Sequence, residues 1–381
     1  MSLPAEKLSV GLVFDDSLDS TDGVAQYVKT LGAWLSAQGH GVNYLVGQTK
    51  LSEWSGGPVR SLSRNARVVF NGNRLSIPLP TSQSSIKKAI GNQHFDVIHV
   101  MMPHSPLMAQ KIINLADDQT AVVGTFHVYP AGWLARFGGR LLRTWYGKSI
   151  KRFDQIVSVS SAAAEYALDI FGLKTVIVPN PVDISHFRPK TAVRPKNQIV
   201  FLGRLVPRKG ALSLLQAFAE LKDKTVKLTI AGDGPQRRSL EAETKKLKIE
   251  DRVEFLGFVS EEAKAELLAN AKLACFPSLH GEAFGIVLIE AMAAGAGVVL
   301  GGDNPGYRSV LGQRPELLVN VSNTHAFAAR MEMLMQDKLK AKELHDWQVD
   351  TVQQYDINQV GPQIIDVYRQ QIARRAKKGN N

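Results

Sequence analysis

The 381-residue chain has a single cysteine, Cys275, in the apolar stretch 272–277. One cysteine excludes an internal disulfide and a metal site made of several cysteines, so we interpret Cys275 as an inert core residue. The sequence has no run of about 18 apolar residues, which argues against a membrane-spanning helix. Its first ten residues lack the basic and then apolar pattern of a secretory signal. We therefore expect a reducing, cytoplasmic compartment.

Two functional fingerprints are also missing. No Gly-x-Gly-x-x-Gly sequence follows the first expected strand, which disfavours a nicotinamide-dependent dehydrogenase. No aromatic and basic motif with the spacing of a nucleic-acid-binding domain occurs, although the net charge is +11. A nucleic-acid-binding protein is therefore a distant alternative, and we expect no nucleic-acid partner. A nucleotide-sugar epimerase stays open, because it would share a two-domain α/β design.

The excess positive charge is concentrated in one quarter of the chain. Residues 57–152 hold thirteen Lys and Arg against three Asp and Glu. Within this quarter, residues 132–152 carry six basic residues, no acidic residue and apolar residues at helical spacing. Such a segment is typical either of a membrane-surface helix or of a crossover helix packed on a sheet. We favour packing on a sheet for its apolar face and an anionic membrane surface for its basic face.

Strand-like and helix-like segments alternate along the chain, which predicts parallel sheets with crossover helices. Residues 48–94 read as irregular, with short strands at 67–70 and 75–80. A C-terminal region from about residue 324 reads as mainly helical. We expect other strands at 10–14, 41–46, 95–101, 120–126, 154–159, 199–203, 226–231, 253–256, 273–276 and 298–300, and helices at 23–37, 210–221 and 236–247.

The length and the 44% hydrophobic content are sufficient for two domains. Two prolines and four basic residues in residues 187–196 indicate the boundary between them. We expect one Rossmann-like domain over 1–190 and a second over 191–355. Residues 356–381 are expected to form a helix that ends in a basic tail.

Two carboxylates, Glu282 and Glu290, lie eight residues apart around an apolar run. Eight helical residues turn the chain by about 800°, so these side chains would point about 80° apart and could not share one face as an acid/base pair. We instead predict Glu282 in the loop before a helix and Glu290 on its second turn.

The helix N-terminus between the two carboxylates offers N–H groups and a positive dipole end, which suit a diphosphate. One carboxylate would accept hydrogen bonds from a sugar and the other from a ribose, as a nucleotide-sugar requires. Glu282 could instead simply complement the helix dipole. Glu290 has mainly apolar neighbours, and because an unpaired buried carboxylate is costly, we expect a polar partner or a ligand there.

Loops that follow other strands of the second half carry further candidates, since ligands gather at these strand ends. Arg204 and Lys209 could clamp a diphosphate or be solvent-exposed. Gly232 could allow close backbone approach or supply a turn. Val259 could present its backbone to a nucleobase, while the adjacent Ser260 could merely cap a helix.

In the first half, the loop containing Asp22 and Gly23 leads from a strand into a helix, and His127 ends another strand. The paired motifs of the second half, taken together, resemble the retaining glycosyltransferases of family 4, which have two facing Rossmann-like domains (GT-B) and an interdomain cleft. Residues 124–127 and 281–295 are similar to the phosphatidyl-myo-inositol mannosyltransferase branch of that family. The motifs are Gly203-Arg204, Lys209-Gly210, Gly232-Asp233-Gly234-Pro235 and Glu282 with Glu290.

The resemblance implies that domain 1–190 binds the acceptor, that domain 191–355 binds the nucleotide-sugar and that helix 356–381 crosses back to the first domain. It also implies a role for each matching residue. Arg204 and Lys209 would hold the donor diphosphate, and Glu290 would bind the donor ribose. Glu282 would bind the transferred sugar. His127 would lie near the reacting centre, beside a donor hydroxyl or the acceptor. The residues that would carry the chemistry are therefore His127, Arg204, Lys209 and Glu282.

The remaining implied contacts involve the backbone. Phe284, Gly285 and Ile286 would bind the donor at the start of the helix. Gly23 would let the first loop approach both donor and acceptor. Asp22 stands where that branch usually has another glycine, so it could clash with the diphosphate or bind acceptor hydroxyls.

The function implied is transfer of a hexose, mannose from GDP-mannose, with retention of configuration. The acceptor would be a lipid or glycan such as phosphatidyl-myo-inositol, and the basic first domain would contact the inner face of the plasma membrane. Alternatives are a UDP-sugar donor with a soluble acceptor, or epimerisation of a nucleotide-sugar. We expect no cofactor, and any stimulation by a divalent metal would not involve a protein motif.

Overall fold

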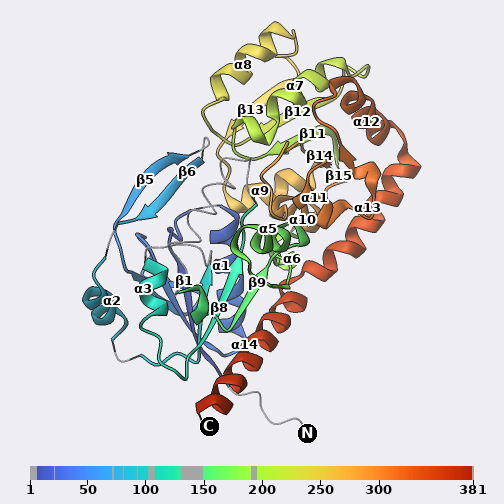
Figure 1. Cartoon of the computed structure of the whole chain (residues 1–381). Helices are drawn as coiled ribbons and strands as arrows, with labels where there is room; N and C mark the ends of the chain where they lie inside the picture. The colour runs from blue at the N-terminus through green and yellow to red at the C-terminus, as the bar shows by residue number, and fades with distance from the viewer. Residues whose placement is uncertain are drawn as a thin grey trace. The chain divides into compact units, whose positions relative to one another are not determined.

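The computed structural model describes residues 7–20, 22–70, 73–79, 81–91, 93–101, 108–129, 149–189 and 195–379. The chain forms two compact units (Figure 1). The first unit contains Met1–Pro181 and Ile357–Asn381, and the second contains Val182–Asp356. The basic segment 132–152, with its predicted helix, lies outside the described residues except for residues 149–152.

The structure describes an eight-stranded sheet in the first unit, with the order β10-β9-β8-β7-β1-β2-β4-β3. The described pairs are parallel except for β3 with β4. Central strands such as β7 are buried along their whole length, as is typical of parallel sheets covered on both faces. The strands are β1 (Ser9–Phe14), β2 (Gly41–Val46), β3 (Glu53–Trp54), β4 (Gly57–Ser61), β7 (Val97–Met101), β8 (Ala121–Phe126), β9 (Gln155–Ser158) and β10 (Val176–Ile177).

Helices cover both faces of this sheet because neighbouring strand residues point to opposite sides. Leu12 of β1 packs in a core with α1 (Gly23–Ala37) and α14 (Ile357–Gly379). Val13, the next residue, packs in a second core with α2 (Gln83–Ile90) and α3 (Met108–Ile113). Helix α5 (Ser161–Phe171) and the short 3-10 helix η1 (Ile150–Arg152) complete the described helices of this unit.

The short strands predicted at 67–70 and 75–80 are confirmed as β5 (Asn65–Phe70) and β6 (Asn73–Pro78), but the prediction that the rest of residues 48–94 is irregular is wrong. Besides β3 and β4, this segment contains the antiparallel hairpin of β5 and β6, followed by α2. Helix α2 begins where the Ser82 hydroxyl accepts a hydrogen bond from Ser85 N–H, and it buries Ile86. So short a helix with one fully buried residue gives too little periodicity to be seen in the sequence.

The described part of the second unit contains a six-stranded parallel sheet with the order β13-β12-β11-β14-β15-β16. Its helices are α6 (Ile184–Phe187), α7 (Ala211–Glu220), α8 (Arg237–Lys246), α9 (Glu261–Ala269), α10 (Ile286–Ala293), α11 (Pro305–Leu311), α12 (Thr324–Gln336) and α13 (Lys338–Val352), with the 3-10 helices η2 (Pro207–Lys209), η3 (Pro315–Leu317) and η4 (Gln353–Tyr355). The strands are β11 (Lys196–Leu202), β12 (Lys227–Ala231), β13 (Val253–Gly257), β14 (Ala271–Phe276), β15 (Val298–Gly302) and β16 (Leu318–Val319). The predicted fold class, two parallel α/β sheets with C-terminal helices, is confirmed.

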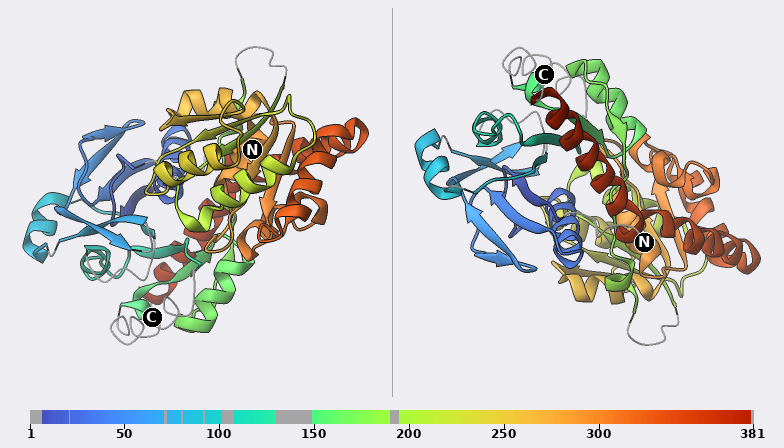
Figure 2. Two further views of the ribbon diagram at one scale, coloured as in Figure 1. Left: turned by 90° about the horizontal axis from the view of Figure 1, so that it is seen from above. Right: turned by 90° about the horizontal axis from the view of Figure 1, so that it is seen from below.

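The units divide at residues 181/182 and 356/357, whereas the sequence placed the boundaries at 190/191 and 355/356. The shift arises because residues 182–189 pair with the end of the second unit rather than with the first sheet. Val182 N–H donates to the carbonyl of Tyr355 at 2.8 Å, and Phe187 is buried beside α9. Helix α14 belongs to the first unit, and the red helix in Figure 2 runs across the strands of that unit.

Within the described residues, no helix has the length and apolar character needed to span a bilayer.

Candidate functional site

Loops of the second unit meet at the carboxyl ends of β11, β12 and β14. Gly232, after β12, has φ 133°, and a Cβ there would lie 1.9 Å from the carbonyl oxygen of Gly203 after β11. Gly210 has φ 73°, and its Cβ would lie 2.0 Å from the carbonyl oxygen of Pro277 after β14. Only glycine fits such contacts. The close backbone approach at Gly232 is thus made to Gly203, and its contact with a donor stays a prediction.

Glu282 lies in the loop before α10, as predicted. Its Oε1 accepts hydrogen bonds from Lys209 Nζ at 2.7 Å and from Arg208 Nη1 at 2.8 Å. The three side chains are only 12–19% exposed, so the charges are little screened by water. Burial alone would raise the pKa of Glu282, but the Lys209 and Arg208 cations hold it below its ordinary value. The structure therefore presents an ionised carboxylate shared by two cations.

Sequence reasoning missed Arg208. This residue lies in η2, and its carbonyl oxygen accepts a hydrogen bond from Leu279 N–H at 2.8 Å, which ties the two loops together. The adjacent basic pair Arg208-Lys209, directly after Pro207, was a signal that could have found it. Arg204 lies half-buried in the same loop, two residues after β11. Three cationic side chains thus belong to one loop beside Glu282.

Buried side chains hold the loop before α10. Tyr307 Oη lies 3.1 Å from Ser278 Oγ, and Asn304 Nδ2 donates to the carbonyl of Ser278 at 2.9 Å. Gly285 is the N-cap residue of α10 with φ 110°, and a Cβ there would lie 2.7 Å from the Tyr307 ring. Because glycine has no side chain to cap the helix, the first N–H groups of α10 face no N-cap side chain.

Two neighbours of Gly285 are also predicted donor contacts. Phe284 is buried, with its ring 5.5 Å from that of Tyr355, so its side chain is part of the packing. Ile286 is the first residue of α10 and is half-buried. Donor contacts of Phe284, Gly285 and Ile286 would therefore come from the backbone, and they stay predictions.

Glu290 lies on the second turn of α10, as predicted, and is 7% exposed. Lys264 Nζ on α9 donates to Glu290 Oε1 at 2.9 Å and contacts Glu261 at 2.6 Å. Burial alone would lower the pKa of Lys264, but the two carboxylates raise it above its ordinary value, so this lysine stays charged. The polar partner expected for Glu290 is therefore Lys264, which sequence reasoning missed.

The loop after β13 contains Val259, which is half-buried, and Phe258, which is 71% exposed. Ser260 Oγ accepts a hydrogen bond from Ala263 N–H at 3.3 Å and so caps α9. The interpretation of Ser260 as a helix cap is confirmed. Whether Val259 binds a nucleobase stays a prediction.

In the first unit, Asp22 and Gly23 lie at the start of α1. The Asp22 carboxylate accepts hydrogen bonds from Val24 N–H at 2.9 Å and Ala25 N–H at 3.0 Å. Asp22 is thus the N-cap of α1, a role that sequence reasoning missed. Gly23 is exposed as the first residue of that helix. Contacts of Asp22 and Gly23 with donor or acceptor stay predictions.

His127 directly follows β8 and is half-buried. Its ring lies edge-on to Tyr27 of α1, with ring centroids 4.6 Å apart and an interplanar angle of 73°. Tyr27 lies on the second turn of α1, whose first residue is Gly23. The structure therefore brings His127, Asp22 and Gly23 to the same end of one helix.

Asp15, which the sequence did not single out, directly follows β1. Its Oδ1 accepts a hydrogen bond from Ala109 N–H of α3 at 2.9 Å. Burial, opposed by this hydrogen bond and aided by the neighbouring Asp16, raises the pKa of Asp15 to about 7. The first unit thus has a carboxyl group that titrates near neutral pH at the carboxyl edge of its sheet.

Comparison with known proteins shows the family of this chain. Residues 21–186 match the family described as Glycosyltransferase Family 4, and residues 183–348 match Glycosyl transferases group 1. The chain belongs to glycosyltransferase family 4, has the GT-B fold and is a hexosyltransferase.

The chain is also similar to relatives that are named as mannosyltransferases. The chain is 31% identical over 375 residues to a phosphatidyl-myo-inositol mannosyltransferase of Mycolicibacterium smegmatis, covering 95% of this chain and 93% of the relative. It is 29% identical to an MMP alpha-(1->4)-mannosyltransferase of Mycolicibacterium hassiacum, covering 74% and 72%. Among solved structures, sucrose-phosphate synthase from Thermosynechococcus elongatus has a TM-score of 0.76 at 21% identity and covers 96% of this chain and 99% of that one, which shows the shared fold.

Proposed function

We propose that this enzyme transfers mannose from GDP-mannose, with retention of configuration, to a phosphatidyl-myo-inositol-type lipid acceptor. The observation that carries the donor assignment is the pair of cations, Arg208 and Lys209, held by Glu282 beside the start of α10. The mannosyl donor and the inositol lipid are inferred from the printed activity of relatives about 30% identical over most of the chain.

In the proposed reaction, the bond between the sugar C1 and the diphosphate oxygen breaks, and the diphosphate leaves with the bonding electrons. The acceptor oxygen bonds to C1 on the same face, and its proton passes to the leaving phosphate oxygen. Negative charge thus grows on the diphosphate. Arg204, Arg208, Lys209 and the N-terminus of α10 stabilise this charge without reorganisation at the moment of reaction.

Glu282 links the cations to the sugar. In the structure, its carboxylate neutralises part of the charge of Lys209 and Arg208. When the donor diphosphate binds these cations, the Glu282 oxygens become acceptors for the hydroxyls of the transferred sugar. Glu290 keeps one oxygen on Lys264 and offers the other to the ribose hydroxyls. Glu282 stays ionised in this role, because Lys209 and Arg208 hold its pKa below the ordinary value.

On the acceptor side, we assign His127 to a hydroxyl at the reacting centre and Gly23 to the approach of donor and acceptor. The edge-on contact with Tyr27 supports the assignment of His127, because it holds the imidazole in one orientation at the end of β8. Asp22 is assigned to capping α1 and, through its exposed side, to acceptor hydroxyls.

The donor assignment predicts that Lys209→Met and Arg208→Met each lower kcat/KM with GDP-mannose by about 100-fold, since each removes one preorganised donor to the developing charge. Either variant leaves Glu282 with one cation, so thermal melting should change little. Lys342→Met is the matched control, because Lys342 is also paired with a carboxylate, Asp346, but on the exposed face of α13. The assay contains EDTA, because we expect no bound metal.

Turnover by both variants at the rate of the Lys342→Met control would refute the donor assignment. Loss of wild-type activity in EDTA, with recovery on adding a divalent metal, would refute the expectation that no metal is needed.

We further propose that the first unit binds the anionic inner face of the plasma membrane. Helix α2 exposes two consecutive lysines, Lys87 and Lys88, within the basic quarter of the chain. Each lysine near an anionic bilayer surface contributes about 1 kcal/mol of attraction, which salt screens. Localisation in the cytoplasm, with peripheral attachment, follows from this proposal.

Binding to vesicles of phosphatidylcholine with 30% phosphatidylglycerol is therefore expected to weaken by about tenfold in Lys87→Ala/Lys88→Ala, and to weaken with added salt. Lys245→Ala/Lys246→Ala is the control, because it also removes two consecutive exposed helix lysines, but from α8 of the second unit. Equal binding to charged and neutral vesicles, or equal loss in both double variants, would contradict the proposal.

A further inference from the structure

A chain of buried polar side chains lies inside the first unit. His99 of β7 is fully buried, and both of its ring nitrogens lie within hydrogen-bond distance of a hydroxyl group. Nδ1 is 2.6 Å from Tyr368 Oη of α14, and Nε2 is 2.6 Å from Thr125 Oγ1 of β8. Thr125 is in turn hydrogen-bonded to Tyr27 of α1. Hydrogen bonds thus connect four side chains from four different elements, with the His99 imidazole between Tyr368 and Thr125.

His99 is neutral at physiological pH. Burial, with a contribution from nearby His127, lowers the pKa of His99 to about 3. A neutral imidazole has one donor and one acceptor nitrogen, so the chain must run in a single direction. Either Tyr368 donates to Nδ1 and Nε2 donates to Thr125, or Thr125 donates to Nε2 and Nδ1 donates to Tyr368. In both cases, removing one hydroxyl leaves a buried ring nitrogen without its partner.

This series of hydrogen-bonded side chains ends beside His127. Thr125 and His127 are two residues apart at the end of β8, and the Tyr27 ring lies edge-on to His127 at 4.6 Å. The Tyr27 ring also lies 6.3 Å from the His99 ring. Because Tyr27 is 2% exposed and packed in the core, its ring is held in place, and its hydroxyl has Thr125 as a hydrogen-bond partner.

We propose that Tyr368, His99 and Thr125 are positioning residues that set the imidazole of His127 through Tyr27. The proposal rests on the proposed function, which assigns His127 to the reacting centre. It gives helix α14 a role in the reaction, because α14 contributes Tyr368 to this series of hydrogen-bonded side chains. These residues touch neither substrate nor the reacting atoms.

The test uses substitutions that remove one hydroxyl and keep the shape. Tyr368→Phe and Thr125→Val break the chain on either side of His99, and Thr125→Ser keeps a hydroxyl at the second of these positions. Tyr44→Phe is the matched control. Tyr44 is a fully buried tyrosine of β2, and its hydroxyl has no hydrogen-bond partner among the described residues. Each variant is measured for kcat, for KM of GDP-mannose and for thermal melting.

Tyr368→Phe and Thr125→Val are expected to lower kcat by about tenfold with KM changed less than about twofold, because a small displacement of a reacting group lowers the rate without loss of binding. Their double variant should be no slower than the slower single variant, since both break one chain. Thr125→Ser should restore most of kcat, and Tyr44→Phe should retain it.

A second readout does not depend on activity. The ¹⁵N chemical shifts of the His127 imidazole should move in Tyr368→Phe and Thr125→Val and stay in place in Tyr44→Phe. Unchanged His127 shifts together with kcat equal to that of Tyr44→Phe would overturn the inference, and would reduce the chain to a stabilising network. Full activity of His127→Ala would instead overturn the proposed function, while the shifts would still decide whether the chain positions this imidazole.

Discussion

Two carboxyl groups, Asp15 in the first unit and Glu282 in the second, have pKa values shifted in opposite directions. Asp15 has one backbone N–H donor and an acidic neighbour, and its pKa rises to about 7. Glu282 is also buried, but two cations hold its pKa below its ordinary value. The partner, and not the degree of burial, therefore decides the ionisation state.

The raised pKa of Asp15 predicts that the protein loses stability as pH rises. In the unfolded chain the group ionises near 3.8, whereas in the folded chain it keeps its proton up to about 7. The folded state therefore binds more protons between these values, and the free energy of unfolding falls across that window. Asp15→Asn, which can still accept from Ala109, should remove this loss and be more stable by about 2 kcal/mol at pH 7.5.

Urea unfolding at several pH values between 5 and 8 measures this effect. Asp16→Asn is the control, because it removes a neighbouring charge but leaves Asp15 buried and most of the slope in place. An equal pH dependence of the wild type and Asp15→Asn would show that Asp15 does not titrate in this window.

The pairs that hold the candidate site could not be read from the sequence, although their members partly could. Glu282 and Lys209 were predicted from their loops, but they are 73 residues apart, and their direct ion pair depends on how β11 and β14 align. Lys264 lies 26 residues before Glu290. Only the cost of an unpaired buried carboxylate indicated that some partner must exist.

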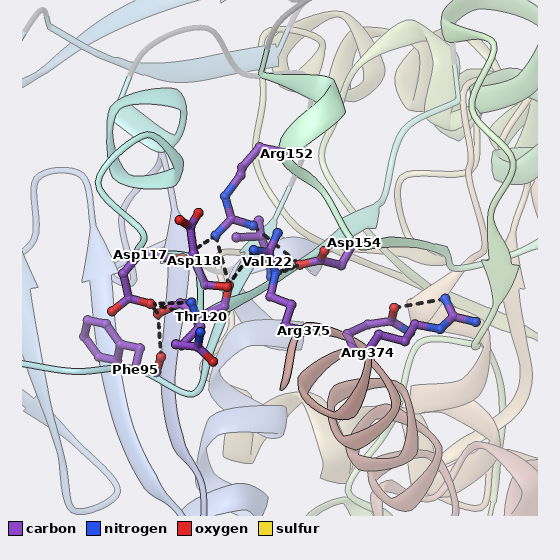
Figure 3. Close-up of polar contacts among 11 residues, drawn as sticks. Phe95, Asp117, Asp118, Thr120, Val122, Arg152, Asp154, Arg374 and Arg375 are labelled. Atoms are coloured by element: carbon purple, nitrogen blue, oxygen red, sulfur yellow. Dashed lines mark hydrogen bonds and ion pairs between the residues drawn. The ribbon is translucent and has the colours of Figure 1, made fainter. Parts of the chain in front are cut away.

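Helix α14 is the element that most clearly joins distant parts of the chain. Near its end, Arg375 donates to Asp154 Oδ2 at 2.7 Å and to the carbonyl of Asp118 at 2.9 Å (Figure 3). The same Asp154 oxygen accepts from Val122 N–H at 2.9 Å and contacts Arg152 at 3.5 Å. This cluster fixes the last turns of α14 against the starts of β8 and β9.

Arg375→Ala is predicted to destabilise the first unit by about 2 kcal/mol, because the Asp154 carboxylate, 13% exposed, loses its shortest ion pair. Arg374→Ala is the control: Arg374 is exposed and donates to Gln371 within α14 itself. Hydrogen exchange of peptides covering residues 368–379 should accelerate in the first variant and not in the second. Equal exchange in both would mean that packing alone holds this end.

Long elements were predicted closely and short ones were not. Helix α1 and strand β2 have the predicted bounds, because a complete amphipathic stripe or a buried alternating run marks them. The two-residue strands β10 and β16 were missed, since two residues have no period and their pairing depends on neighbours. The N-cap role of Asp22 was missed, although Asp directly before a helix is a common N-cap residue.

At the scale of the whole molecule, the alternating pattern was sufficient to predict two parallel sheets, since crossover connections leave few other arrangements. The first boundary was placed nine residues late, because Val182 already pairs with Tyr355 of the second unit before the prolines are reached. The first unit includes α14 from the far end of the chain, so it is built from two segments that the second unit separates in sequence, whereas the second unit is continuous.

The proposed reaction of this enzyme is mannosyl transfer from GDP-mannose with retention of configuration. The most direct measurement is NMR of the product formed from GDP-α-mannose, and separately from UDP-α-glucose, with phosphatidylinositol vesicles as acceptor. We predict an α-mannoside from GDP-mannose and no product from UDP-glucose. A β-mannoside, or transfer from UDP-glucose alone, would contradict the account.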